Sequence, residues 1–513
     1  MKISKSLPKH FLSIILTFLA ILLFIKCEDT FEEEIDLQNT TLDEQIIPWN
    51  DLLLQLDLGS EMAFVQNGES IQDAIDLALP GDVIYIEPGN YQGKISNNKT
   101  DIKLIGISLL PGDLTINNSK ESNIDILKLY DQNNIDKFQK KSKNRAKRRS
   151  IRNFSRKELG RGIAHYKFDL QAGKGEFDIV TIHRVVREST PFRPIPTKGH
   201  VFMVHGANQD FDAIFLTAGA EVIDAKTSSP FYLASKNIDV WAIDMGWTKV
   251  PSKGITDFSF MKDWGIEKDI DHLLKAMRIA RVARLFSRQG CSGLNLLGFS
   301  YGVTIVYGAA NRETQQNNWM KHNIKGIIPV DNSFKTNLSN CTEVDEFKNM
   351  ISNGQFYNPW LDQFPVMGGL ALNRPDAYDM HPDLTNSQFM EFVGSQGFFA
   401  GENGKFLYTD PIRFFHLATN LSVRMPTKIF LDMASVKCDT EDVTFDDHLE
   451  EISIPILYIG ANNDIGSYTP SLTASTDITI QVVDGYGHAD PWMAYDADTQ
   501  VWDQLRGWIT THK

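Results

Sequence analysis

The stretch Gly298-Phe299-Ser300-Tyr301-Gly302 constrains the fold of this chain more than any other segment. An apolar run, Leu294–Leu297, comes directly before it and has the length and composition of a buried strand. The residues after it, from Val303 onward, are typical of the start of a helix. A strand that turns sharply into a helix at a serine lifts the serine oxygen out of the sheet, and the flanking glycines relieve the crowding of the turn. The sequence therefore predicts an accessible serine at the end of a buried strand.

The chain is long enough for a large core with additional parts. It has 513 residues, of which 42% are hydrophobic and 23% charged, as in globular proteins. Its net charge of −14 argues against nucleic acid as the main partner. We expect a signal peptide over 1–26, an acidic linker over 27–60, a first folded segment over 61–125, a basic linker over 126–161, a core over 162–332 and 451–513, and an insertion over 333–450.

The first residues have the pattern of an export signal. Lys2, Lys5 and Lys9 form a basic head, and Phe11 to Ile25 form an apolar run of about fifteen residues, short for a membrane span. Cys27 comes next, and acidic residues succeed it. This pattern resembles a bacterial lipoprotein signal, which implies lipidation at Cys27, attachment to the membrane, and a location in the cell envelope, on the outer membrane and exposed at the cell surface. An uncleaved single-pass anchor and simple secretion remain open.

The segment over 61–125 has a different pattern from the rest of the chain. Ser70 to Ala78 has helical spacing, Pro80-Gly81-Asp82 ends the helix, and Val83–Ile86 and Ile102–Gly106 are strand-like. The pattern resembles the opening of right-handed parallel β-helix proteins such as pectate lyases. The resemblance covers about 50 residues, fewer than the three or more repeats that a solenoid normally stacks. It leaves open a carbohydrate-related role or a spacer.

From about residue 162 the pattern is that of alternating strands and helices. Phe177–Ile182 alternates in the manner of an antiparallel edge strand. The other predicted strands are apolar runs: Val201–Val204, Val240–Ile243, Leu294–Leu297, Ile327–Val330, Ile456–Ile459 and Ile478–Val483. This predicts an α/β protein with a mainly parallel sheet covered by helices on both faces. The insertion between 333 and 450 is too long for a simple loop, so we expect a helical lid.

Four motifs in this part occur in a recognisable order. They are His205-Gly206-Ala207 after the first parallel strand, the Ser300 motif, Gly460–Asp464 after the strand at 456, and Gly485–Pro491 after the last strand. On these motifs the chain resembles the α/β-hydrolase family over about 350 residues, with lipases and esterases as the nearest kind. The resemblance implies Ser300 as nucleophile, His488 as base and Asp464 as acid, with Asp331 as the alternative acid. It implies an oxyanion hole made by the backbone N–H groups of Tyr301 and Ala207, with His205 shaping the turn.

No catalytic or metal-binding role is predicted for several other histidines and aspartates. His183, His272, His381, His416 and His448 lack the spacing of a metal site, so neither a metal nor another cofactor is predicted. Asp269 and Asp271 lie on a predicted helix, where we expect solvated carboxylates. Cys341 and Cys438 both fall in the insertion and could pair, or they could be free thiols together with Cys291.

These features favour an exported serine hydrolase that cleaves carboxylic esters through an acyl-enzyme at Ser300. Its substrate would be a lipid or an acylated carbohydrate. Two alternatives remain: an esterase acting on ester substituents of polysaccharides, and a catalytically silent surface binding protein. The same catalytic groups could also cleave amides.

Overall fold

A sheet of ten strands forms the centre of the protein in a computed structural model. The strands lie in the order β18-β17-β14-β13-β11-β12-β9-β8-β7, with β10 paired to β9. The structure describes residues 49–53, 61–93, 95–96, 99, 101–117, 124–131, 133–134, 137, 151–336, 342–438, 442–461 and 465–513. The strands of this sheet are β7 (Ile151–Gly160), β8 (Ile163–Gln171), β9 (Ile179–Thr190), β10 (Arg193–Pro194), β11 (Gly199–Val204), β12 (Ile238–Asp244), β13 (Leu294–Phe299), β14 (Ile324–Val330), β17 (Ile456–Ala461) and β18 (Ile478–Val483).

The prediction of a mainly parallel sheet in a mixed α/β protein is confirmed. Strands β12, β11, β13, β14, β17 and β18 pair parallel, whereas β9, β8 and β7 extend the sheet antiparallel. Two expectations need correction. The strand predicted at 177–182 is antiparallel but lies inside the sheet, because β8 and β7 continue beyond it. Residues 151–160, expected within a basic linker, form β7, which pairs antiparallel with β8 and leaves most of its side chains exposed or half-buried.

Helices cover both faces of the sheet. Alternate residues of β11 point to opposite sides: Phe202 belongs to the hydrophobic cluster under α6 (Ile266–Phe286) and α7 (Tyr301–Thr314). Met203 belongs to the cluster under α5 (Ser229–Ser235) and α14 (Asp503–Thr511). Every residue of β11, β12 and β13 is buried. These central strands are therefore near-continuous apolar runs, as expected of strands covered on both sides.

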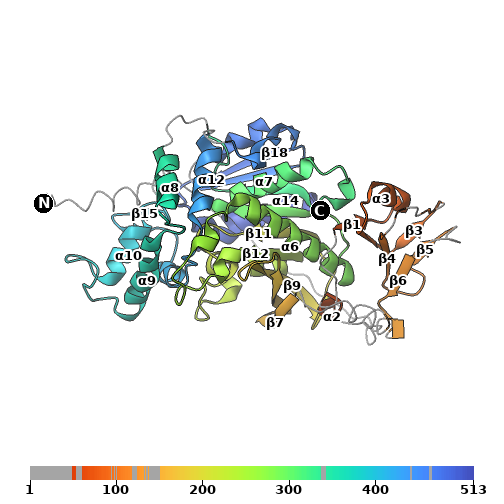
Figure 1. The fold of residues 1–513 in the computed structure, drawn as a ribbon. Coiled ribbons are helices and arrows are strands. Elements are labelled where there is room, and N and C mark those ends of the chain that lie inside the picture. The colour runs from red at the N-terminus through yellow and green to blue at the C-terminus, as the bar shows by residue number, and fades with distance from the viewer. Residues whose placement is uncertain are drawn as a thin grey trace.

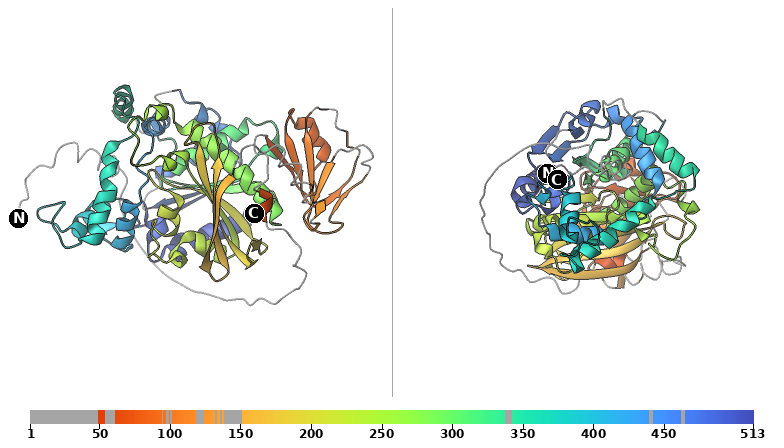
Figure 2. Two further views of the ribbon diagram at one scale, coloured as in Figure 1. Left: turned by 60° about the horizontal axis from the view of Figure 1, so that its bottom comes forward. Right: turned by 90° about the vertical axis from the view of Figure 1, so that its left-hand side faces the viewer.

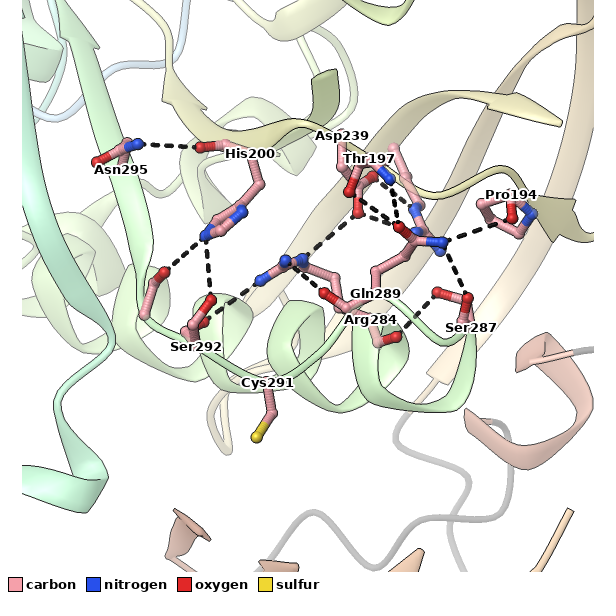
Figure 3. A network of polar contacts seen from close by, with 12 residues as sticks. Pro194, Thr197, His200, Asp239, Arg284, Ser287, Gln289, Cys291, Ser292 and Asn295 are labelled. Carbon is pink, nitrogen blue, oxygen red and sulfur yellow. Dashed lines mark hydrogen bonds and ion pairs between the residues drawn. The ribbon is translucent and has the colours of Figure 1, made fainter. Parts of the chain in front are cut away.

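A polar network holds the amino-terminal edge of the sheet (Figure 3). Arg184 on β9 donates two hydrogen bonds of 2.8 and 2.9 Å to the carboxylate of Asp239, both side chains being buried. Arg284 of α6 lies 3.5 Å from the same carboxylate and donates to the carbonyl of Gln289. The imidazole of His200, at the start of β11, bonds to the carbonyl of Gly293. These contacts fix the strand beginnings, so the opposite, carboxyl edge is the one left for loops.

The segment between β14 and β17 is an insertion that extends to one end of the molecule (Figure 1, cyan and teal). It is largely helical, as predicted. Its elements are α8 (Thr342–Ser352), α9 (Gln363–Asn373), α10 (Asn386–Gly394), β15 (Gly401–Glu402), β16 (Lys405–Phe406), α11 (Pro411–Thr419) and α12 (Thr427–Cys438). Aromatic residues join it to the core, because Phe399, Phe414 and Phe415 belong to the same hydrophobic cluster as β11 and α14. The insertion therefore packs on the core through an apolar contact.

The N-terminal unit lies at the other end of the molecule (Figures 1 and 2, orange). Four strands pair parallel in the order β1-β2-β4-β6, and β3 pairs parallel with β5 in a second small sheet. The bounds are β1 (Met62–Val65), α3 (Ile71–Leu77), β2 (Val83–Ile86), β3 (Gly89–Tyr91), β4 (Lys103–Ser108), β5 (Leu114–Ile116) and β6 (Ile124–Lys128). Ser70 caps α3 by accepting from the N–H of Asp73, which explains why the helix begins there.

Buried contacts dock the N-terminal unit on the core. The ammonium group of Lys321 lies 2.7 Å from the carboxylate of Asp82, and both side chains are 5% exposed. Glu87 accepts from the N–H of Cys291 at 2.9 Å, and the guanidinium of Arg281 lies 3.9 Å from the ring centre of Phe64. The unit is thus held by paired charges and a cation–π contact rather than by apolar surface alone.

A short helix within the predicted acidic linker also belongs to the core. Helix α2 (Trp49–Leu53) buries Trp49 against the ring of Tyr166, at 5.0 Å between ring centres, and beneath the guanidinium of Arg184. Both Trp49 and Leu53 are buried. A tryptophan side chain has a large apolar surface, and its burial is favourable. Trp49 therefore anchors this part of the chain on the core.

The described part of the chain includes Cys291 and Cys438. Cys291 is buried and free, and Cys438 is disulfide-bonded. Cys341 lies outside the described residues, so its pairing with Cys438 stays a prediction. In the part of the chain that the structure describes, no helix is both long and apolar enough to cross a membrane. The predicted signal segment and Cys27 lie outside that part.

The buried Lys321–Asp82 pair should contribute to the stability of the protein by holding the N-terminal unit on the core. Replacing Lys321 with Met leaves the Asp82 carboxylate buried without its counter-charge, which typically costs about 3–5 kcal/mol. Urea unfolding followed by tryptophan fluorescence should show this loss. The matched control is Lys157→Met, because the Lys157–Glu221 pair is largely exposed and should cost under about 1 kcal/mol. Equal losses in the two variants would contradict the docking role.

Candidate active site

Ser300 occupies a strained turn between β13 and α7. Its backbone has φ 55° and ψ −116°, a conformation that non-glycine residues rarely adopt. A side chain on Gly298 would overlap the carbonyl of Gly302, and a Cβ on Gly302 would lie 2.6 Å from the carbonyl oxygen of Val204. Both glycines are therefore required by close backbone approach. The turn is fixed by the N–H of Ser300, which donates to Val330 at 3.0 Å.

His488 lies beside this turn and is paired with a buried carboxylate. Its Nδ1 is 2.6 Å from Oδ2 of Asp331, which is 1% exposed. The other carboxylate oxygen of Asp331 accepts from the N–H of Ala461 at 2.7 Å. The His488 ring lies 4.7 Å from the ring centre of Phe299, the residue before Ser300. With Nδ1–H donating to Asp331, the imidazole presents Nε2 as its free nitrogen, the arrangement that a general base requires.

The carboxylate in this pair is the alternative acid of the sequence analysis. Asp464, which the motif order favoured, lies outside the described residues, so its role stays a prediction, and the structure pairs His488 with Asp331. Asp331 comes directly after β14, the immediate neighbour of β13. Asp331 also has φ 49°, which turns its side chain off the end of the strand.

The loop that carries His488 is held by the insertion. The N–H groups of His488 and Ala489 donate to the carbonyls of Gly397 and Phe398, at 3.2 and 2.7 Å. Gly487 fits against this segment without a side chain, since a Cβ there would overlap the backbone of Phe399 and Ala400. The Phe398 ring lies 6.0 Å from the His488 ring. The position of the imidazole therefore depends on residues about 90 positions away in the chain.

Asp490 ties the two segments together. Its Oδ2 accepts from the N–H groups of Ala400 and Gly487, and its Oδ1 accepts from the hydroxyl of Thr409 at 2.7 Å. Burial raises the pKa of this carboxyl to about 6, although these hydrogen bonds act to lower it. Sequence analysis did not single out Asp490. Its position two residues after His488, in a glycine-containing loop, was the available signal.

The loop after β11 forms the other side of the turn. His205 is buried: its Nδ1 lies 2.8 Å from the carbonyl of Gly206, and its Nε2 accepts from the N–H of Met245 at 3.3 Å. Both ring nitrogens are used, and burial lowers the pKa of the imidazole. These contacts support a shaping role for His205 rather than proton transfer. Ala207, two residues on, is half-buried at the carboxyl edge of the sheet.

Tyr301 supplies the first N–H of α7, and first-turn N–H groups have no partner within their own helix. Its side chain points the other way, into the core, where the hydroxyl donates to Asp269. Trp247 Nε1 donates to the same carboxylate oxygen at 3.2 Å. The expectation that Asp269 is solvated is wrong: it is 3% exposed, because α6 turns this side toward the sheet. Asp271, two residues later, has its side chain largely exposed.

Comparison with known proteins bears on the fold. No family model matches the chain, and no curated protein matches it significantly. Among solved structures, one described as a candidate lipase from Sulfolobus solfataricus matches with a TM-score of 0.53 at 18% identity, over 70% of this chain and 99% of that chain. A candidate α/β-hydrolase from Nostoc (TM-score 0.38, 13% identity, 70% and 98% covered) and a monoglyceride lipase variant from Saccharomyces cerevisiae (0.36, 13%, 70% and 95%) also match.

The similarity at TM-score 0.53, with the sheet order and the strand–Ser300–helix turn, shows the α/β-hydrolase fold. At 18% identity it shows the fold alone.

The burial of Asp269 should make the free energy of unfolding depend on pH. Burial raises the pKa of its carboxyl to about 7 from 3.8, so the folded state binds the proton more tightly than the unfolded state. The contribution of Asp269 is therefore most favourable below about pH 4 and falls as the pH rises to about 7. Asp269→Asn should remove this dependence. The free energy of unfolding of the wild type relative to the variant should fall by a few kcal/mol between pH 4.5 and 8.

The exposed Asp383→Asn variant is the control and should keep the wild-type pH profile. Parallel profiles for the wild type and Asp269→Asn would show that Asp269 titrates normally, against the prediction.

Proposed function

We propose that this protein is an exported serine hydrolase that cleaves carboxylic esters through an acyl-enzyme at Ser300. The observation that supports it best is the strained Ser300 backbone beside His488, whose imidazole is paired with the buried Asp331. A serine hydroxyl is a weak nucleophile until a positioned base takes its proton, and such a base needs its second nitrogen held. Enzymes of this fold carry that arrangement at the carboxyl edge of the sheet, where all three residues lie here.

The reaction proceeds in two halves. Ser300 Oγ attacks the ester carbonyl carbon while His488 Nε2 takes the hydroxyl proton, and Asp331 stabilises the resulting imidazolium. The oxyanion accepts hydrogen bonds from the N–H groups of Tyr301 and Ala207, each typically worth about 3 kcal/mol in the transition state. The imidazolium gives its proton to the leaving alcohol. Water, deprotonated by His488, then attacks the acyl-enzyme and releases the acid and Ser300.

The insertion is proposed to act as the lid over this site. Its segment 397–400 already contacts the His488 loop, and the rings of Phe398 and Phe299 flank the imidazole. Such apolar walls favour an acyl or aryl group of low polarity and help to exclude water. A lipid ester is therefore the first substrate class.

An esterase for acylated polysaccharides is the second candidate. The observation that favours it is the parallel pairing of β1, β2, β4 and β6, with β3 and β5 in a second parallel sheet. We interpret this as a short β-helix start of the kind found in pectate lyases. Its role here would be to bring the hydrolase to a polysaccharide.

Substitution of the three residues tests the mechanism. Ser300→Ala should lower kcat on p-nitrophenyl esters by about 10⁶-fold. Asp331→Asn should lower it by about 10⁴-fold, because the amide holds the wrong imidazole tautomer. Asp464→Asn is the matched control and should stay close to wild type. A large loss in Asp464→Asn with little loss in Asp331→Asn would reverse the assignment of the acid.

The wild type and the Ser300→Ala variant also distinguish between the candidate functions. Faster turnover of long-chain than short-chain p-nitrophenyl esters supports the lipid substrate. Release of acetate, methanol or phenolic acids from crude polysaccharide by wild type, and not by Ser300→Ala, supports the polysaccharide esterase. A fluorophosphonate probe should label wild type only. Failure to label, with no turnover of any ester, would indicate a silent binding protein instead.

Attachment to the membrane through lipidated Cys27 is also proposed. The basic head, the apolar run and the position of Cys27 support it. Wild-type protein should therefore sediment with outer membranes, and Cys27→Ser should appear in the soluble fraction or keep an uncleaved signal. Equal membrane association of the two, with a cleaved signal in both, would rule out lipidation as the anchor.

A further inference from the structure

A buried cluster of histidines and carboxylates lies on the sheet face opposite to α6 and α7. His165 Nε2 is 2.9 Å from His183 Nδ1, and one ring nitrogen of each histidine and one carboxylate oxygen of Asp212 lie within 4.8 Å of one another. His165 is 7% exposed and His183 fully buried. The proposed ester hydrolysis uses none of these residues. Two imidazole nitrogens and one carboxylate oxygen converging on one point are ligands that a divalent transition metal prefers.

We propose that His165, His183 and Asp212 form a binding site for one divalent transition-metal ion, with Zn²⁺ as the first candidate. The site is assembled across the sheet rather than along the chain. Residue 167 of β8 is opposite His183 of β9, so His165 is the diagonal neighbour of His183 on the same face. Asp212 is contributed by the π-helix η1 (Asp212–Leu216), which packs over that face. No local spacing could have indicated it.

The imidazole of His183 lies against a carboxylate that is not itself a proposed ligand. Its Nε2 lies 2.9 Å from Oδ2 of Asp244, on the neighbouring strand β12. Asp244 Oδ1 accepts from the N–H of Phe211 at 2.9 Å, which fixes the carboxylate. Metal-binding histidines generally give their second ring N–H to such a carboxylate, which leaves the other nitrogen free to bind the ion. Nδ1 of His183, the nitrogen that faces His165 at 2.9 Å, then carries the lone pair.

Asp212 presents an oxygen with no hydrogen-bond partner within the described residues. Its Oδ1 is buried, whereas its Oδ2 lies 3.0 Å from the ammonium of Lys167. A buried carboxylate oxygen without a partner is costly, and a bound cation would satisfy it. The side chains of Asp212 and Lys167 are 29% and 40% exposed, so an ion can reach the site from solvent on this side.

The charges and protons at the site suit a cation. Two carboxylates, Asp212 and Asp244, contribute negative charge there, and the ammonium of Lys167 pairs with Asp212. With His183 Nδ1 accepting, the 2.9 Å contact between the histidines requires the proton on His165 Nε2. Binding an ion moves this proton to His165 Nδ1 and frees the Nε2 lone pair. The ion then has three protein ligands, and water completes its coordination.

The ion would tie strands β8 and β9 to the segment after Ala207. Phe211, next to Asp212, already packs its ring 4.5 Å from His183 and 5.6 Å from His165. We therefore expect a stabilising ion rather than one that takes part in ester cleavage.

Metal titration of the full-length chain tests the site. Protein freed of metal with EDTA is titrated calorimetrically with ZnCl₂, and with CoCl₂ while visible absorption is monitored. Wild type should bind one ion per chain, with d–d bands for Co²⁺. Asp212→Asn and His165→Gln should each weaken binding by at least about 100-fold, and Asp244→Asn by about 10–100-fold. Lys167→Met should strengthen it about tenfold by removing the competing charge.

His448→Gln is the matched control, since it removes a partly exposed histidine paired with Glu451 and should leave binding unchanged. Zn²⁺ should also raise the melting temperature of wild type by a few degrees, and not that of Asp212→Asn. The partly exposed Asp212 and Lys167 keep the test valid if His165→Gln does not fold. Absence of stoichiometric binding, or binding that survives in both Asp212→Asn and His165→Gln, would overturn the proposal.

Discussion

The strained backbone of Ser300 is the constraint on which the rest of the site depends. A positive φ at a serine costs on the order of 1–3 kcal/mol and persists only where the surroundings over-determine it. Here Gly298 and Gly302 allow the turn to close against its own backbone and against Val204, while Val330 fixes the serine N–H. The strands β11, β13 and β14 thus meet at one point, and each supplies a loop that begins where the strand ends.

The insertion contributes backbone contacts to the candidate site. The His488 loop comes after β18, at the edge of the sheet, and its backbone is bound by residues 397–400 and through Asp490. Movement of the insertion would therefore move the imidazole relative to Asp331. In an enzyme whose substrate approaches beneath such a segment, binding and alignment of the base would be coupled.

Buried polar groups support the site from both faces of the sheet. Under α7, Asp269 joins Tyr301 to Trp247 directly behind the serine. On the other face, Asp244 joins His183 to the backbone of Phe211 in the segment after Ala207. Satisfied polar contacts of this kind favour one arrangement over others that an apolar core would tolerate. The segments at Ser300 and after Ala207 thus each rest on a buried carboxylate.

The sequence by itself determined the sheet class, the Ser300 turn, the position of His488 and the shaping role of His205. These depend on local patterns: apolar runs, glycines at a tight turn, and motif order along the chain. Only the tertiary structure decided that Asp331 pairs with His488, that Asp269 is buried, and that His165, His183 and Asp212 converge. Each of these depends on which strands are neighbours and on which side of a helix faces the sheet. Residues that lie tens to hundreds of positions apart in the chain carry no local sequence signal of strand order or helix orientation.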